Sequence, residues 1–244
     1  MSFLRDFMRW RRVRRHVALH GWTFEFHGIS VTLPEMDTPG CASALLQGKY
    51  EAEEAKLIAA HLPPDRPVIE LGGSMGVVSA LIASRLADTV AHVIVEANPA
   101  LLEACALNAA VARRPLAKVQ HAAVAYGGPV ARFSVGGNVH ANHLAREGDT
   151  ASVIEVKAVT LETLWQDIGA PDGFTLVCDI EGAEAQMVAT DRRVLEAAGM
   201  VIMEMHPAVY QGGVATEDEI IGTLQVSGLH LRQRFADVGL WTRD

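Results

Sequence analysis

The sequence has few cysteines and no long apolar run. Its cysteines, Cys41, Cys105 and Cys178, form no CxxC pair and match no zinc-ligand spacing, so neither a disulfide framework nor a zinc motif is expected. An odd, sparse set of cysteines is typical of a reducing compartment. No apolar run approaches the roughly 18 residues of a membrane span, and no apolar segment of a secretory signal follows the N-terminal arginines. We therefore expect a cytoplasmic protein.

The sequence also lacks an excess of positive charge. The net charge is −8, and such an acidic chain is not expected to bind nucleic acid. Residues 1–15 differ, because they combine six arginines and several apolar side chains with a single acid, Asp6. A helix over residues 1–20 could contact an anionic membrane surface or a partner. The alternative, which we favour, is that its apolar side packs on the rest of the chain.

Apolar patterns and turn signals divide the chain into two parts. Residues 1–60 hold the basic segment, a hairpin around His27-Gly28 and a lead-in helix, and residues 61–244 alternate strands and helices. The predicted strands are 22–33 (the hairpin), 67–71, 91–96, 117–124, 153–159, 174–180, 200–206, 229–235 and 238–242. The predicted helices are 48–62, 75–87, 98–113, 161–168, 183–198 and one that starts at a Thr216–Glu219 capping box. Residues 126–150 are expected to be irregular.

This alternation predicts an α/β fold with a mostly parallel sheet, helices on both faces and an antiparallel C-terminal strand. Ligands of such sheets bind beyond the carboxyl ends of the strands. Polar or small residues stand at those ends: Glu70, Gly72, Gly73, Ser74, Gly76, Glu96, Asn98, His121, Asp179, Glu181, Glu204 and His206. Buried charges are costly unless they are used or paired, so these residues mark a candidate site.

The stretch from Val68 to Gly76 raises the question of which ligand binds there. Its three glycines suit either a tight strand-to-helix turn or the close approach of a nucleotide to bare backbone. Glu96 lies 20 residues after Gly76, where an acid accepts hydrogen bonds from ribose hydroxyls. A dinucleotide is disfavoured, because Leu71 replaces the first glycine of GxGxxG and Glu70 would repel a phosphate. S-adenosylmethionine (SAM) has no phosphate, and Glu70 suits its positive charge.

Several segments resemble FkbM-type SAM-dependent methyltransferases. They are GKYEAEE, VIELGGSMGVVS, VEANPALLEACALNA, LVCDIEGAEAQMV and VIMEMHP, in this order within about residues 45–207. The fourth is similar to the family's IDVEGAE motif and is the most specific. The resemblance implies a class I methyltransferase, Rossmann-like fold. It also implies methylation, usually of an oxygen, on a sugar, a polyketide or another small metabolite or glycan.

The resemblance also assigns a cofactor site for SAM, with S-adenosylhomocysteine as the product. The implied binding residues are Tyr50, Glu70, Gly72, Gly73, Ser74, Gly76, Glu96, Ala97, Asn98, Ala122 and Ala123. The sequence departs from the commoner family pattern, because Glu70 replaces an aspartate and Gly72-Gly73-Ser74 replaces Gly-Ala-Asn. These changes keep the charge and the small size.

Two pairs of polar residues are candidates for catalysis. Methylation of an alcohol needs an aligned nucleophile and a general base. Asp179 and Glu181 are two residues apart, so in extended backbone they point the same way, and Glu204 and His206 repeat this spacing. We expect Asp179 or Glu181 to be the base or hydroxyl anchor, with His206 assisting. Alternatively, Glu181 only caps a helix and His206 is a buried, hydrogen-bonded side chain.

The same four side chains could instead hold Mg²⁺ or Mn²⁺ that positions a vicinal diol, although we favour a site without metal. For substrate binding, the segment 134–144 offers Asn138, His140, Asn142 and His143, either as a lid or as a surface loop. Cys178 lies inside a predicted strand and is expected in the core.

Other functions remain open on the sequence alone. They are N-methylation on the same fold, hydride transfer with NAD, and a non-catalytic adaptor that contacts a membrane or a partner through residues 1–20. A homodimer also remains open. Retention of the acids Glu70, Glu96 and Asp179 speaks against an adaptor, which has no need of a complete cofactor pocket. We therefore expect an O-methyltransferase.

Overall fold

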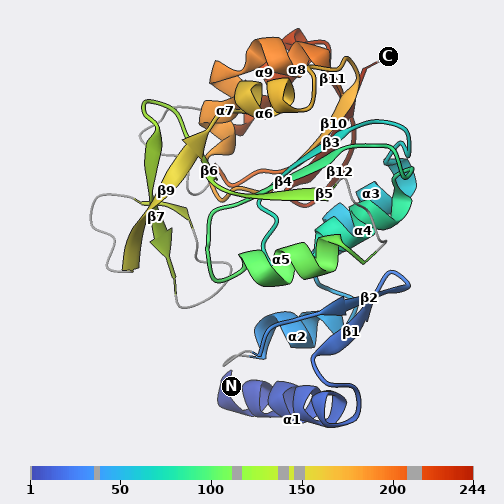
Figure 1. Ribbon diagram of the computed structural model, residues 1–244. Coiled ribbons are helices and arrows are strands. Elements are labelled where there is room, and N and C mark those ends of the chain that lie inside the picture. The colour runs from blue at the N-terminus through green and yellow to red at the C-terminus, as the bar shows by residue number, and fades with distance from the viewer. Residues whose placement is uncertain are drawn as a thin grey trace.

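The computed structural model describes residues 2–35, 39–111, 117–136, 143–145, 152–207 and 216–243. Within them, a seven-stranded sheet has the order β12-β13-β11-β10-β3-β4-β5 (Figure 1). Its strands are β3 (Val68–Leu71), β4 (His92–Glu96), β5 (Ala117–His121), β10 (Phe174–Cys178), β11 (Ala198–Glu204), β12 (His230–Phe235) and β13 (Val238–Thr242). Strands β5, β4, β3, β10 and β11 lie side by side in this order, and each neighbouring pair is parallel. Strand β13 pairs antiparallel with both β11 and β12.

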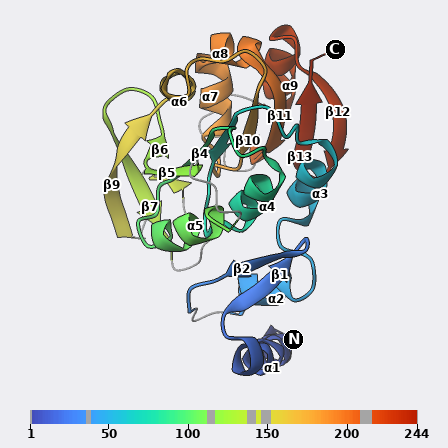
Figure 2. The same ribbon diagram turned by 45° about the vertical axis from the view of Figure 1, so that its right-hand side comes forward.

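Helices cover both faces of this sheet (Figures 1 and 2). One face carries α3 (Ala52–His61), α4 (Val77–Arg85) and α5 (Leu102–Ala109), and the other carries α6 (Leu161–Asp167), α7 (Glu184–Thr190), α8 (Arg192–Ala197) and α9 (Glu217–Val226). Strands β3, β4 and β10 are buried along their whole length, as expected for strands covered on both faces. The predicted α/β architecture, including the antiparallel C-terminal strand, is confirmed.

The register of the parallel strands aligns their carboxyl ends. Leu71 pairs with both Val95 and Cys178, and Cys178 pairs with Met203. The residues that follow this row are Gly72, Glu96, Asp179 and Glu204. Four strands therefore place a polar residue or a glycine directly after this row, at one edge of the sheet.

The N-terminal segment forms a separate layer beneath α4 and α5 (Figure 1). It consists of α1 (Ser2–His20), β1 (Thr23–Phe26), β2 (Ile29–Thr32) and α2 (Gly40–Leu45). The hairpin is confirmed, whereas α2 is not among the predicted helices. Asn108 of α5 fastens this layer, because its side chain accepts from the Thr32 N–H at 2.8 Å and donates to the carbonyls of Thr32 and Met75. On α1, Trp10, Val13 and Val17 pack on the core.

A second sheet adjoins the main one, with the order β6-β9-β7-β8. Its strands are β6 (Ala123–Val124), β7 (Val130–Val135), β8 (His143–Leu144) and β9 (Ser152–Val159). The prediction of an irregular segment over 126–150 is therefore wrong for β7. The missed signal is the alternation in which Ala131 and Phe133 turn inward to pack with Val156 of β9, while Arg132 faces solvent.

Two helix boundaries also differ from the prediction. The expected helix over 183–198 is divided into α7 and α8 at Asp191, whose carboxylate accepts hydrogen bonds from the Leu161 N–H and the Tyr126 hydroxyl. The helix expected from residue 98 begins later, because the Asn98 side chain accepts from the Ala100 N–H at 3.0 Å in a local turn. No helix in the described ranges is long and apolar enough to cross a membrane.

Candidate active site

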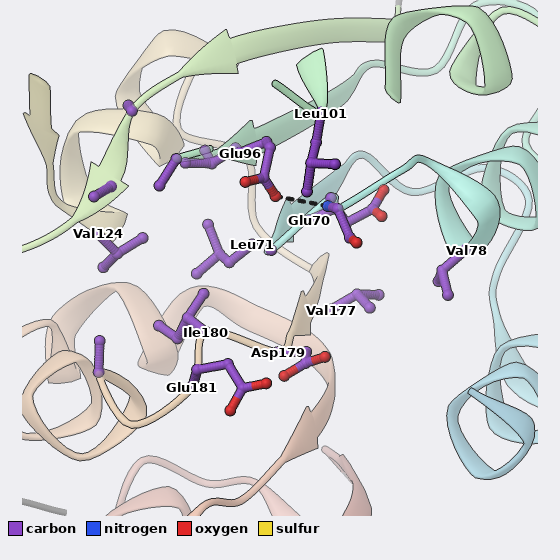
Figure 3. A pocket seen from close by; sticks show the side chains of 18 of the residues that line it. Glu70, Leu71, Val78, Glu96, Leu101, Val124, Val177, Asp179, Ile180 and Glu181 are labelled. Carbon is purple, nitrogen blue, oxygen red and sulfur yellow. Dashed lines mark hydrogen bonds between the residues drawn. The ribbon is translucent and has the colours of Figure 1, made fainter. Parts of the chain in front are cut away.

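A cavity opens at the carboxyl ends of β3, β4 and β10 (Figure 3). Figure 3 shows Glu96 and Leu101 on one side of it, and Asp179 and Glu181 on the other. The predicted site residues that line it are Tyr50, Glu70, Gly72, Gly73, Ser74, Glu96, Ala97, Ala122, Ala123, Asp179 and Glu181. Of the predicted cofactor residues, only Gly76 and Asn98 are absent from the lining.

The glycines of the β3–α4 loop are required by the packing of the protein itself. A Cβ at Gly72 would lie 1.8 Å from the carbonyl oxygen of Asp179, and one at Gly73 would lie 2.4 Å from Ile94 Cγ2. A Cβ at Gly76 would lie 2.6 Å from the carbonyl oxygen of Cys105. The tight-turn interpretation therefore explains all three glycines, and the loop packs closely against β10, β4 and α5.

Glu96 is joined to the glycine loop by its carboxylate. One oxygen accepts the Ser74 N–H at 2.7 Å (the dashed line in Figure 3), and the other accepts the Asn98 N–H at 2.6 Å. Burial raises the pKa of Glu96, while these backbone hydrogen bonds partly offset the rise. Each carboxylate oxygen has further acceptor capacity, so Glu96 can bind hydroxyls in the cavity without giving up the loop.

Glu70 is held inside the protein by two neighbours. Its Oε1 accepts the Ser79 hydroxyl at 2.7 Å, and its Oε2 lies 2.7 Å from His92 Nε2. Ser79 belongs to α4 and His92 begins β4. Glu70 therefore ties these two elements to β3, and this contact accounts for the buried acid at the end of that strand.

The opposite end of the cavity is acidic. Tyr50, Glu51 and Glu54 approach it from the start of α3, and Asp179 and Glu181 from the end of β10. Glu54 is only 4% exposed, and in the described part of the chain its carboxylate has no hydrogen-bond or ion-pair partner. Burial, followed by repulsion from nearby carboxylates, raises the pKa of Glu54 and of Asp179 well above the usual range. Sequence analysis missed Glu51 and Glu54, although GKYEAEE contains both.

A second cavity adjoins the first at this acidic end. The residues that line both are Tyr50, Glu51, Glu54, Asp179 and Glu181. Only the second cavity is lined by Glu204 and His206, as well as by Arg9 of α1. We call this second cavity the acidic cleft. The two cavities meet where the predicted catalytic residues stand.

His206 lies at the centre of four carboxylates. Its Nδ1 is 2.8 Å from Glu184 Oε1, and its Nε2 is 3.5 Å from Glu181, 3.6 Å from Asp179 and 3.8 Å from Glu204. Burial alone would lower the pKa of His206, but the hydrogen bond with Glu184 and the surrounding negative charges raise it to about 9. The structure thus brings the four predicted catalytic residues together and adds Glu184, one turn along from Glu181, which sequence analysis missed.

Non-glycine residues with positive φ occur at the first cavity and also outside it, for example at His27 and Ala170. Glu51, Ser74 and Glu181 have φ values of 39°, 47° and 53°, a left-handed conformation that non-glycine residues rarely adopt. All three line the first cavity. Strained residues of this kind are frequent at functional sites, and these three border the candidate site.

The predicted substrate segment is only partly described. Asn138, His140 and Asn142 lie outside the described residues. His143 belongs to β8 and lines neither cavity, whereas the next residue, Leu144, lines the first together with Phe133 of β7. The second sheet thus contributes an apolar wall, which the sequence did not reveal because β7 and β8 were not predicted.

The mostly parallel sheet with helices on both faces is the Rossmann-like fold of class I methyltransferases. Residues 75–239 match the family described as the methyltransferase FkbM domain. This range spans more than half of the 244 residues, so the chain belongs to the FkbM methyltransferase family. The family supports methyl transfer over hydride transfer. No curated protein sequence matches the chain.

Three solved structures resemble the chain at low sequence identity. Magnesium protoporphyrin IX methyltransferase from Synechocystis PCC 6803, with bound SAM, is 14% identical over 98% of this chain and 91% of its own, with a TM-score of 0.49. Fibrillarin from Aeropyrum pernix, also with SAM, is 12% identical over 77% of this chain and 71% of its own, with a TM-score of 0.45. The CcbJ methyltransferase from Streptomyces caelestis is 15% identical over 80% of this chain and 95% of its own, with a TM-score of 0.43.

Proposed function

We propose that this chain transfers a methyl group from SAM to a hydroxyl group of a small-molecule or glycan acceptor. The observation that carries the proposal is the junction of two cavities at Asp179 and Glu181. One cavity suits an adenosyl cofactor, and the acidic cleft gives an acceptor access to the same point. Methyl transfer needs such a junction, because donor and nucleophile must meet in line.

The first cavity suits SAM along its length. Leu101, Val124 and Phe133 supply apolar surface for an adenine ring, and the carboxylate of Glu96 supplies acceptors for ribose hydroxyls. The acidic end, where Glu54 has no side-chain partner among the described residues, suits the positive charge of the cofactor. SAM, when bound, supplies an activated methyl group on a sulfonium centre. Glu70, which Ser79 and His92 already hold, is assigned to supporting the loop.

The residues of the junction suit an alcohol acceptor. A hydroxyl loses its proton when it is methylated, and Asp179 and Glu181 place carboxylates where the two cavities meet. One of them anchors the hydroxyl and accepts the proton. His206 faces both through Nε2, while Glu184 holds its Nδ1. We assign His206 to orienting these carboxylates.

The test is methyl transfer from labelled SAM to a panel of sugars and polyketides. Asp179→Asn and Glu181→Gln are expected to identify the base, since one of them should lower kcat by about 100-fold or more with little change in SAM affinity. Glu103→Gln, on the exposed side of α5, is the matched control and should keep full activity. A product methylated on nitrogen, or full activity in both junction variants, would contradict the assignment.

A further inference from the structure

The acidic cleft is lined by more carboxylates than basic side chains among the described residues. Among the described residues, the acidic cleft is lined by seven carboxylates, from Glu51, Glu53, Glu54, Asp179, Glu181, Glu204 and Asp237. Its basic side chains are Arg9, Lys49 and His206. His206 Nδ1 already lies against Glu184. Carboxylates gathered in a cleft repel one another unless a cation lies between them.

Three of these carboxylates surround one point. Oxygen atoms of Glu51, Asp179 and Glu204 all lie within 4.8 Å of one another. They come from the segment before α3, the end of β10 and the end of β11, and the aligned register of β10 and β11 brings the last two together. Carboxylate oxygens from several elements that converge in this way are the ligands that Mg²⁺ and Mn²⁺ prefer.

A second observation points to a cation at the same place. Glu54 lines both cavities, is 4% exposed, and has no side-chain partner among the described residues. Asp179 Oδ1 is buried without a hydrogen bond, and its ion-pair neighbour His206 Nε2 lies at 3.6 Å, beyond hydrogen-bond distance. A buried carboxylate without a partner is costly, so a cation in this space would stabilise Glu54.

We propose that Glu51, Asp179 and Glu204 bind one divalent, oxygen-preferring cation, Mg²⁺ or Mn²⁺, at the junction of the two cavities. Glu54 adds negative charge from the buried side. The binding of the ion does not depend on the proposed function, but its role does. In that role the ion holds the acceptor hydroxyl, Asp179 is a metal ligand, and Glu181 remains as the proton acceptor.

The experiment is a titration of the full-length, chelator-treated chain with Mn²⁺, followed by the electron paramagnetic resonance signal of free Mn²⁺ and carried out without SAM. We expect one saturable site per chain. Glu204→Gln and Glu51→Gln should each weaken binding by about tenfold or more. Glu53→Gln is the matched control, because Glu53 lines the same cleft but is outside the group of three. The affinity of Glu53→Gln for Mn²⁺ should match that of the wild-type chain.

Two results would overturn the proposal. One is the absence of a saturable site in folded wild-type protein. The other is an equal effect of Glu53→Gln and Glu204→Gln, which would reveal only diffuse attraction to an acidic surface. Glu51→Gln gives the answer if Glu204→Gln does not fold. SAM titration of the same samples separates this proposal from the proposed function, because Glu204 does not line the first cavity: Mn²⁺ binding without SAM binding would leave the ion site standing and remove the methyltransferase assignment.

Discussion

The carboxylate of Glu184 lies 2.8 Å from Nδ1 of His206, and the Glu184 side chain is fully buried. It comes from the first turn of α7, whereas His206 follows β11. The contact therefore ties a helix on one face of the sheet to the residue that faces the carboxylates proposed for catalysis. It fixes the orientation of the imidazole ring, which leaves Nε2 directed at Asp179, Glu181 and Glu204.

Loss of this contact should affect both stability and turnover. Glu184→Ala leaves a buried nitrogen of His206 without its partner, so we expect a loss of about 1–3 kcal/mol in the free energy of unfolding. Urea unfolding measures it. The exposed control Glu103→Ala should stay within about 0.5 kcal/mol of the wild type. If His206 is a positioning residue, Glu184→Gln lowers kcat while the SAM dissociation constant is unchanged; equal loss of both would indicate a merely structural contact.

Alanine substitution at Gly72 and at Gly222 should change the stability of the fold in opposite directions. Gly72 has a φ of 90°, and its Cβ would meet the Asp179 carbonyl oxygen, so Gly72→Ala should destabilise the fold by about 2 kcal/mol or more. Gly222 lies within α9 with open space around it, so Gly222→Ala should stabilise the fold by about 0.5–1 kcal/mol. Thermal unfolding of the two variants checks the contrast, and a tolerated Gly72→Ala would refute the packing account of the loop.

The three cysteines should be unreactive in the folded protein. Cys41, Cys105 and Cys178 are buried, and burial raises the pKa of each thiol. At pH 8 the thiols therefore stay protonated and poorly nucleophilic. A disulfide exchange reagent such as Ellman's reagent should detect no thiol in the native chain and all three in denaturant. Rapid reaction of the native chain would show that one of these sites opens.

Much of the fold follows from the sequence because the strands are apolar and the turns are clear. The alternation predicted β3, β4, β10 and β11, and the parallel sheet then places Asp179 and Glu204 at one edge. Short elements were missed where local pattern is weak. The helix α2 has only six residues, and they show no clear alternation of polar and apolar side chains. The division between α7 and α8 depends on hydrogen bonds of Asp191 with Leu161 and Tyr126, which are distant in the sequence.

The site was predictable only as far as strand ends define it. Glu96, Asp179 and His206 stand at such ends, but Glu51 and Glu54 enter from α3, whose position relative to the sheet has no local signal. For Glu70, the residue itself was predicted but its partner was not. The sequence shows an acid beside a ligand loop, whereas its partner His92 becomes visible only when β3 and β4 are paired.

The central claim is that the first cavity binds SAM through Glu96, and calorimetric titration of the chain with SAM tests it most directly. We expect saturable binding to wild-type protein, and Glu96→Ala should weaken it by about tenfold or more, because a hydrogen bond to a charged group contributes about 1.5–3 kcal/mol. Glu103→Ala, with another acid replaced on neighbouring α5, should bind as the wild type does. Absence of binding to folded wild-type protein, or equal affinity in Glu96→Ala, would contradict the account.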